Sequence, residues 1–347
     1  MITKNDESKL LSFLFERYDL KGYELSVLQG HEGGRNKIYI CHSETREDIV
    51  LRVSSLRDRT KEDYLAELEY VRFLYEHGAS VANVLDSVNH NLLEQIEWNQ
   101  VTITICSFQR EKGILLVENN YRYREGVPLG EYFFNCGKVL GKIHALSKEY
   151  VPCHTRYSFF ERFGETHLKE VLPSGHEPLL KRFYEILANL RNLEQTKETF
   201  GMLHFDFGDS NYSIDFNTGN ITVYDFDNCC LGFYLYDLAD VWTNGVGWVQ
   251  FESDPAKRKS FMENYFQTVL DGYRSETAFD ERFLKNLPLF IDATILESIV
   301  DKVETMLRED GIVTWDEEFI YRERCLVERI PYCGFFDGIY SSNHPFV

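Results

Sequence analysis

The chain has 347 residues, of which 44% are hydrophobic and 15% aromatic, enough apolar material for the core of one two-lobed protein. Its formal net charge of -19 argues against nucleic acids and anionic membranes as partners, because both bind through basic patches. No apolar run reaches membrane-spanning length and residues 1–9 are polar, so we expect a soluble, cytoplasmic protein.

The cysteines and histidines indicate neither a disulfide framework nor a zinc site. The eight cysteines lack framework spacing, and Cys229 and Cys230 are adjacent rather than arranged as Cys-x-x-Cys. The ten histidines form no zinc-binding pattern. We therefore expect reduced, mostly buried thiols.

The first part of the chain predicts one helix followed by a small sheet. Apolar residues between 10 and 15 follow an Asn-Asp pair and favour a helix. Short runs rich in Ile, Val, Leu and Tyr at 24–29, 37–42 and 48–53 are typical of strands.

A glycine-containing segment, residues 30–36, separates the first two predicted strands. Gly30, Gly33, Gly34 and Asn36 would let backbone amides approach a phosphate closely. A flexible hairpin connection explains the segment equally well, because the full Gly-x-Gly-x-x-Gly pattern is missing.

A lone charge, Arg52, lies inside the third apolar strand, and a guanidinium can hold phosphate oxygens bidentately. Lys37 is the alternative cation. Residues 61–77 have helical spacing and end at Gly78; on this helix Glu67 is the expected partner of Arg52, with Glu69 as second choice.

The strand predicted at 101–108 is followed by a charged, glycine-containing segment that we interpret as a hinge, about 107–113. It divides the chain into an N-terminal lobe, 1–108, and a C-terminal lobe, 109–347. Helical periodicity at 129–146, 178–193, 235–243, 256–270 and 282–307 predicts a mainly α C-terminal lobe.

The segment 203–227 contains polar residues at a spacing suited to phosphoryl transfer. Asp206 follows His204 by two residues, Asn211 follows Asp206 by five, and Asp225 closes a hydrophobic run after the turn 217–220. Such a reaction needs an acceptor for the hydroxyl proton and hard oxygen ligands for magnesium.

These residues resemble the aminoglycoside phosphotransferase and choline kinase-like family, small-molecule kinases with a protein-kinase-like fold. The resemblance extends to Asp225-Phe226-Asp227, to Tyr236-Asp237-Leu238-Ala239 and, for the bacterial homoserine-kinase-type members, to 140–146 and 329–332. It implies an α+β fold with a small N-terminal lobe, an antiparallel sheet with a helix, and a larger, mainly helical C-terminal lobe.

The resemblance also implies roles. Asp206 would be the catalytic base, Asn211 and Asp225 the magnesium ligands, and His204 a brace for the loop. Arg52 occupies the position of the phosphate-contacting lysine found in many members, a departure that puts the geometry of that contact in question.

Nucleotide binding would use the glycine segment, Arg52 braced by Glu67, and the backbone at Ser107, Phe108 and Gln109. ATP is the expected nucleotide, with GTP open, and Mg²⁺ the expected metal. The acceptor would be a small molecule with a hydroxyl group, for which the acidic balance gives a weak preference for a cation.

Four further residues have less specific roles. The sequence favours two roles for Asp209 equally, a contact for a substrate cation and a turn residue. Asp227, expected on the same strand face as Asp225, would touch a second magnesium or simply end the strand. Asp237 would support the loop, and its other reading is a helix N-terminal charge. Trp242 is the acceptor-contact candidate, alongside Trp248, Glu297, Asp301 and Tyr332 as other wall residues.

Three alternatives to the small-molecule kinase remain open on sequence: a nucleotide-binding pseudokinase or regulator, which the Arg52 departure favours; a protein kinase of the same fold; and a metal-dependent hydrolase using His204, Asp206 and Asp209. The hydrolase fits least, since such sites draw on more histidines and would leave Arg52 unexplained.

Overall fold

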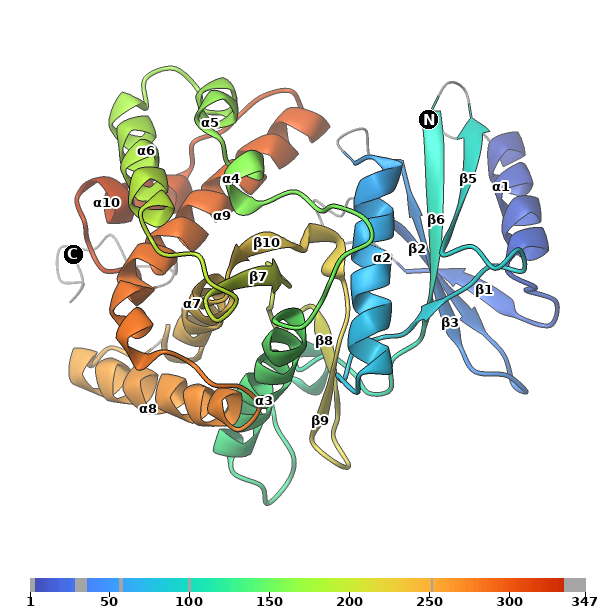
Figure 1. Ribbon diagram of the computed structural model, residues 1–347, viewed down its shortest axis with the longest axis horizontal. Coiled ribbons are helices and arrows are strands. Elements are labelled where there is room, and N and C mark those ends of the chain that lie inside the picture. The colour runs from blue at the N-terminus through green and yellow to red at the C-terminus, as the bar shows by residue number, and fades with distance from the viewer. Residues whose placement is uncertain (1–3, 29–35, 56–58, 99–100, 251, 334–347) are drawn as a thin grey trace. The chain divides into compact units, whose positions relative to one another are not determined.

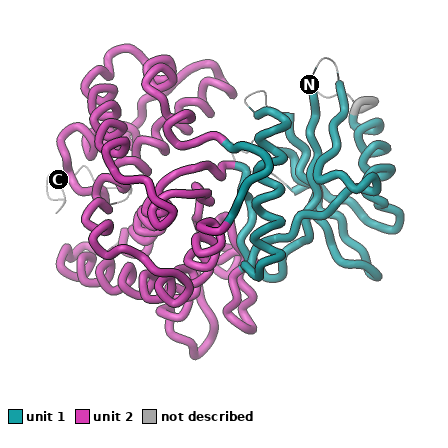
Figure 2. The backbone as a smooth tube through the Cα atoms, in the orientation of Figure 1, with its two compact units in different colours: residues 1–113, 150–156, 222–227 teal, residues 114–149, 157–221, 228–347 magenta. Residues whose placement is uncertain are grey.

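The structure, a computed structural model, describes residues 4–28, 36–55, 59–98, 101–250 and 252–333 (Figure 1). The chain forms two compact units, shown separately in Figure 2. Unit 1 comprises residues 1–113, 150–156 and 222–227, and unit 2 comprises 114–149, 157–221 and 228–347. None of the described helices is both long and apolar enough to cross a membrane.

Unit 1 is built on an antiparallel sheet in the order β1-β2-β3-β6-β4, with β5 also paired to β6. Its strands are β1 (Glu24–Val27), β2 (Lys37–His42), β3 (Ile49–Ser54), β4 (Val84–Leu85), β5 (Leu93–Trp98) and β6 (Val101–Gln109). Alternate residues of β2 and β3 point into a core that Leu10 and Leu14 of helix α1 (Lys4–Arg17) complete.

Helix α2 (Lys61–Glu76) begins at a capping box. The Thr60 side chain accepts a hydrogen bond from the Asp63 backbone N–H, and the Asp63 carboxylate accepts one from the Thr60 N–H. The helix ends before Gly78, whose φ of +82° is readily adopted only without a side chain. Its buried face includes Glu67, which is 1% exposed.

Two later segments join unit 1, which a single division at residue 108 does not predict. The Tyr150 ring packs against Tyr70 of α2 at a tilt of 51°, with ring centroids 5.1 Å apart. The Val223 carbonyl accepts a hydrogen bond from the Ala82 N–H at 2.8 Å. Contacts between residues far apart in sequence therefore decide the membership of both segments.

Unit 2 is mainly helical (Figure 1). Its helices are α3 (Leu129–Ser147), α4 (Phe159–Arg162), α5 (Glu165–Val171), α6 (Glu177–Arg191), α7 (Leu235–Gly245), α8 (Pro255–Arg274), α9 (Leu287–Glu309) and α10 (Glu317–Val327). Two short sheets accompany them: β7 (Phe200–Leu203) with β10 (Cys230–Phe233), and β8 (Tyr212–Asp215) with β9 (Asn220–Val223), whose last two residues belong to unit 1.

Helices α3 and α8 pack closely because each has a glycine where the backbone of the other helix approaches. A Cβ atom on Gly137 would lie 1.8 Å from the Val269 carbonyl oxygen, and one on Gly272 would lie 2.0 Å from the Phe134 carbonyl oxygen. Both separations are far inside van der Waals contact, so neither position accepts a side chain without moving backbone. The glycines thus set the distance between the two helices.

Candidate active site

The loop that follows β7 is fixed by a completely buried carboxylate, Asp237 of α7. Its Oδ2 accepts the backbone N–H of His204 and its Oδ1 the N–H of Phe205, both at 2.9 Å. His144 of α3 lies with Nε2 3.0 Å from Asp237 Oδ2. Hydrogen bonds to an ionised acceptor are stronger than neutral ones, so this residue holds the loop firmly from behind.

His144 acts as a neutral brace. Burial lowers the pKa of this fully buried imidazole, although the Asp237 carboxylate opposes the shift. Nε2 donates to Asp237, which leaves Nδ1 to accept the hydrogen bond from the Tyr273 hydroxyl at 2.9 Å. A chain of hydrogen bonds therefore connects α8 through α3 to the loop.

Phe205 adopts a left-handed backbone conformation, with φ of 71°. This region is unfavourable for a bulky residue, and it persists only where surrounding contacts impose it. The N–H bond to Asp237 is one such contact, and the Phe205 ring stacks on Tyr236 at 4.5 Å with an interplanar angle of 12°. The resulting turn is followed at once by Asp206.

Asp206 is exposed to solvent, and its backbone is held on two sides. Its N–H donates to His204 Nδ1 at 3.2 Å, and its carbonyl accepts from Asn211 Nδ2 at 2.8 Å. The second bond sets the orientation of the Asn211 amide, which leaves Oδ1 as the atom that can bind a cation. His204 thus supports the loop, and the Asn211 amide leaves a hard oxygen of the kind that Mg²⁺ prefers.

In unit 1, Arg52 and Glu67 form the buried ion pair expected from the sequence. Nη1 lies 2.7 Å from one Glu67 oxygen and Nη2 lies 2.8 Å from the other, and the side chains are 4% and 2% exposed. Burial alone would lower the pKa of Arg52, but the Glu67 carboxylate raises it well above its ordinary value. Lys37, the alternative cation, pairs with Glu7 instead.

Asp225 lies 4.0 Å from Arg52 Nη1 and has a left-handed φ of 60°. Its side chain is 46% exposed, so the carboxylate is accessible as well as close to a fixed positive charge. A non-glycine residue in this conformation often marks a functional position.

The expectation that Asp227 shares a strand face with Asp225 is wrong. Strand β9 ends at Val223, and Asp227 lies in a 3₁₀ turn (Phe226–Asn228). Its Oδ2 accepts from Asn36 Nδ2 at 3.1 Å, and its carbonyl accepts from Arg156. These bonds connect the residue to the end of the glycine segment, whose Gly30, Gly33 and Gly34 lie outside the described residues.

The predicted hinge contacts fall within the sheet. Ser107 and Phe108 of β6 pair with β3 on one side and β4 on the other. The Gln109 N–H donates to the Asn83 carbonyl at 2.8 Å, and the Arg110 N–H donates to the Asp48 carbonyl at 3.0 Å. The ladder therefore extends through the positions predicted for adenine, and the backbone N–H groups of Gln109 and Arg110 are already hydrogen-bonded.

The comparisons with known proteins come from sequence and from structure. The model of the phosphotransferase enzyme family matches residues 27–279, more than half of the chain. The chain belongs to the phosphotransferase enzyme family. Amicoumacin kinase of Bacillus subtilis (strain 168) is 22% identical over 289 residues, which cover 82% of this chain and 81% of that protein.

Solved structures of small-molecule kinases share the fold of this phosphotransferase. An amicoumacin kinase has a TM-score of 0.80 at 21% identity, covering 94% of each chain. A microcompartment-associated aminopropanol kinase has a TM-score of 0.67 at 19% identity, covering 93% of this chain and 97% of that chain. A spectinomycin phosphotransferase has a TM-score of 0.55 at 14% identity, covering 94% and 95%. These likenesses confirm the predicted protein-kinase-like fold class.

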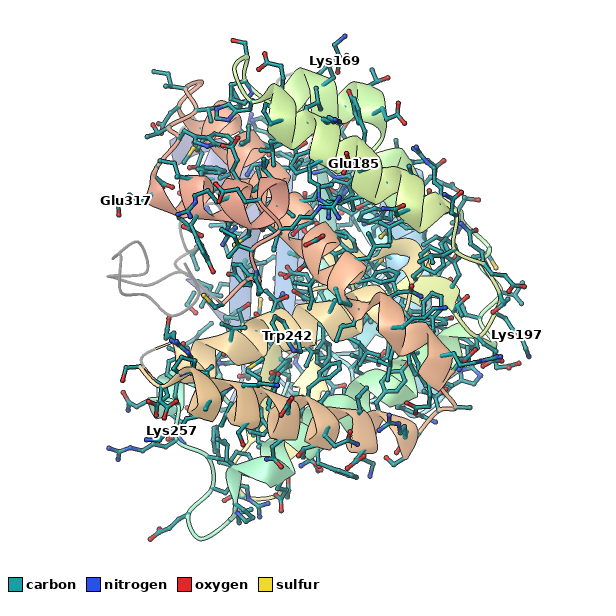
Figure 3. All side chains as sticks on the ribbon, turned by 90° about the vertical axis from the view of Figure 1, so that its left-hand side faces the viewer. Lys169, Glu185, Lys197, Trp242, Lys257 and Glu317 are labelled. Atoms are coloured by element: carbon teal, nitrogen blue, oxygen red, sulfur yellow. The ribbon has the colours of Figure 1, made fainter. Side chains whose placement is uncertain are left out.

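Unit 2 of the phosphotransferase contains an aromatic pocket that Asp209 lines and Trp242 does not. Trp242, labelled in Figure 3, lies on α7, whereas the pocket is lined by Val241, Asn244 and, beyond the helix, Trp248. Positions three or four residues apart share a helix face, and residue 242 is turned away from that face. Trp242 is therefore not among the residues that line this pocket, whereas Trp248, another of the predicted wall residues, is.

Sequence reasoning missed Asp240, a carboxylate of α7 that interacts electrostatically with the candidate base Asp206. Burial raises its pKa well above the ordinary value, and the nearby Asp206 raises it further. Burial likewise raises the pKa of Glu297, with contributions from Asp301 and Asp206. The available signal was spacing, because Asp240 follows the structural Asp237 by three residues on the same helix.

Proposed function

We propose that this phosphotransferase is a kinase that uses ATP and Mg²⁺ to phosphorylate a hydroxyl group of a small molecule. The observation that carries the proposal is the loop geometry. Asp237 fixes the backbone immediately before Asp206, and the Asp206 carbonyl in turn orients the Asn211 amide. A phosphoryl-transfer site consists mainly of such fixed positions, because alignment and charge neutralisation provide most of the catalysis.

Each unit supplies part of the chemistry. In unit 2, Asp206 would orient the acceptor hydroxyl and receive its proton, and Asn211 Oδ1 would hold the metal. In unit 1, Asp225 would be a metal ligand, and Arg52 would provide a positive charge for the nucleotide phosphates. A bound Mg²⁺ would neutralise the charge on those phosphates.

The described residues suit a metal that arrives with its nucleotide. They contain no group of three or more His, Cys, Asp or Glu side chains able to hold a metal ion. Magnesium is usually bound through one or two carboxylates, with phosphates and water completing its shell. A single carboxylate ligand, Asp225, is consistent with that mode.

Nucleotide and acceptor are supported by the named relatives. The similar amicoumacin kinase structure contains AMP-PNP and Ca²⁺, and the spectinomycin phosphotransferase contains ADP. We infer ATP, with GTP as the alternative to test, and adenine bound to the backbone after Arg110. The relatives' names cover an antibiotic and an amino alcohol, so the acceptor class here is a small hydroxyl compound.

Phosphate transfer assays test the proposal. Purified protein is incubated with Mg²⁺ and γ-labelled ATP or GTP over panels of amino alcohols, hydroxy amino acids, sugars and aminoglycosides. Asp206→Ala should lower transfer by about 10²–10⁴-fold while nucleotide binding persists. Asp225→Ala should weaken binding of the magnesium nucleotide itself.

The matched control is Asp271→Ala, which removes an exposed carboxylate of α8 and should leave transfer unchanged. Transfer that survives Asp206→Ala would disprove the assignment of the base. Nucleotide binding with no transfer to any panel member would favour a pseudokinase.

A further inference from the structure

A short segment between α3 and α4, residues 150–156, belongs to unit 1 although its neighbours in sequence belong to unit 2 (Figure 2). We call residues 150–156 the strap. The Thr155 N–H donates to the Glu62 carboxylate at 3.2 Å, and Arg156 Nη1 donates to the Asp63 carbonyl at 2.8 Å. Both acceptors lie in the first turn of α2, so the strap is hydrogen-bonded to the start of this helix.

Arg156 also reaches the segment that follows β9. Its Nη2 donates to the Asp227 carbonyl, which Arg59 contacts at 3.4 Å as well. Arg156 is only 2% exposed, so these carbonyl oxygens take the place of water around its guanidinium. The planar fork of an arginine holds two acceptors at fixed positions, which the amine of a lysine on its flexible stem does less precisely. One guanidinium therefore joins the strap, α2 and the backbone at Asp227.

Aromatic rings join the same three segments. The Tyr70 ring of α2 lies 5.1 Å from the Tyr150 ring of the strap and 6.0 Å from the Phe226 ring. Phe73, one turn further along α2, lies 5.0 Å from Tyr150. Tyr70 and Phe226 are both buried, and buried rings contribute strongly to packing. Phe226 is therefore held against α2, while the carbonyl of the next residue is bonded to the strap.

These contacts surround Asp225, whose backbone has a left-handed φ of 60°. A non-glycine residue keeps this conformation only where its surroundings impose it. Before Asp225, the Val223 N–H donates to the Ser80 carbonyl at 2.9 Å, and the Val223 carbonyl accepts from the Ala82 N–H at 2.8 Å. After it, the hydrogen bond from Arg156 fixes the next turn. The backbone is thus held on both sides of Asp225, and Arg156 provides part of the hold on the C-terminal side.

We propose that Arg156 is a positioning residue, which holds the turn at Asp225 so that this carboxylate can bind the metal of a magnesium nucleotide. The role of Asp225 as a metal ligand rests on the proposed function; the effect of Arg156 on the backbone of residues 222–227 does not. Arg156 acts through the backbone, because both hydrogen bonds described above end at carbonyl oxygens. Outer contacts that orient a metal ligand commonly change metal affinity by about 10–100-fold.

Calorimetry with AMP-PNP measures the effect on the metal. Binding is measured with Mg²⁺ and again with EDTA, and the ratio of the two dissociation constants is the gain in affinity that the metal provides. Arg156→Met keeps most of the side-chain volume but cannot donate, so it should reduce this gain by about 10-fold or more while binding in EDTA changes little. Arg156→Lys keeps the charge without the fork and should also lose most of the gain.

The matched control is Arg182 of α6, a buried arginine of unit 2. It likewise joins distant segments, through hydrogen bonds to the Leu326 carbonyl and the Asp292 carboxylate. Arg182→Met and Arg182→Lys should lower the melting temperature but leave the gain from Mg²⁺ unchanged. An equal loss of the gain in these control variants would overturn the inference, as would a full gain in Arg156→Met and Arg156→Lys.

Hydrogen–deuterium exchange tests the positioning without any ligand. In both Arg156 variants, the amides of residues 222–227 and of the first turn of α2 should exchange faster than in the wild type, whereas those of β2 should not change. Faster exchange in the strap alone would contradict the proposal. A uniform increase throughout unit 1 would contradict it as well, because it would show a general loss of stability.

The two proposals fail in different ways. A wild-type protein that binds AMP-PNP no better with Mg²⁺ than with EDTA would contradict the proposed magnesium site, and hydrogen exchange would then decide whether Arg156 positions residues 222–227. Phosphate transfer that depends on Asp206 and Asp225, with neither readout changed in the Arg156 variants, would support the kinase and overturn the positioning role.

Discussion

The two units differ in whether their buried or partly buried charged side chains form ion pairs. In unit 1, Arg52 and Glu67 share two hydrogen bonds and are almost completely enclosed. In unit 2, the main electrostatic neighbours of Asp240 are other acids, and Asp209 forms no ion pair with a described residue. A paired buried charge fixes structure, whereas an unpaired one costs stability and marks a place where a ligand can act.

This contrast fits the chemistry of the proposed reaction. The phosphate side needs a positive charge whose position does not change, and the bidentate contact with Glu67 supplies it. The acceptor side needs negative charge that becomes favourable only when a proton or a cationic substrate arrives. Four substitutions test the comparison.

The largest effect is expected from Glu67→Ala. It leaves the buried guanidinium of Arg52 without its partner, which typically costs about 3–5 kcal/mol of unfolding free energy. Urea unfolding followed by circular dichroism measures the loss, and nucleotide binding should fall with it. Glu69→Ala is the control, because Glu69 is on the same helix but more exposed and pairs with His154. A loss of unfolding free energy below about 1 kcal/mol would show that the Arg52–Glu67 pair contributes no more than an exposed ion pair.

Asp237→Asn should have the next largest effect. An amide cannot accept all three of the hydrogen bonds from His204, Phe205 and His144, so at least one buried donor loses its partner at a cost of about 1–3 kcal/mol. Turnover should fall more than nucleotide affinity, because the loop that holds Asp206 moves. Tyr273→Phe removes only the outer hydrogen bond to His144 and should give a smaller loss in the same assays.

Asp240→Asn should stabilise the protein while lowering its activity. The pKa of Asp240 is raised in the folded state, so its ionisation opposes folding at any pH above the unfolded value of about 4. The melting temperature of the variant should exceed that of the wild type by a few degrees at neutral pH. The difference should shrink as the pH falls toward 4, and a less stable variant at pH 7 would show that Asp240 is paired after all.

The smallest effect is expected from Glu304→Gln, which tests a paired carboxylate within unit 2. Burial would raise the pKa of Glu304, but hydrogen bonds from His167 and Arg162 lower it to about 2 from its ordinary 4.5. The folded-state pKa is depressed, so this stabilisation is fully present above pH 4.5 and disappears as the pH falls through 2. Urea unfolding should show that the variant has a lower free energy of unfolding than the wild type at pH 6. The two values should converge near pH 2. If the difference in unfolding free energy between the two proteins stayed constant across this pH range, packing rather than the ionisation of Glu304 would cause the effect.

Local sequence signals predicted the long elements well. The periodicity at 61–77 and 129–146 corresponds closely to α2 and α3, because apolar residues at helical spacing and a clear end signal specify such helices. Some short elements were missed, including α4, which has four residues, and the strand β5, although the four-residue strand β1 was predicted. A helix of one turn is stabilised by its surroundings more than by its own sequence.

The candidate site shows the same division. The spacing of His204, Asp206 and Asn211 indicated the loop, and Glu67 was chosen correctly over Glu69 as the partner of Arg52. Asp240 needed the structure, since helix α7 has acidic or aromatic residues on more than one face. Only packing shows which face borders the loop.

The sequence alone determined which chemical groups this protein has in its catalytic segment, because the spacing of Asp206, Asn211 and Asp225 is a property of the chain. It also determined the helices and strands whose periodicity is long enough to specify them. The tertiary structure decided which charges are paired and which are not. Burial and the approach of distant side chains determine whether Arg52, Asp209 and Asp240 are stable in their charged forms. Both depend on the three-dimensional fold and are not apparent from the sequence.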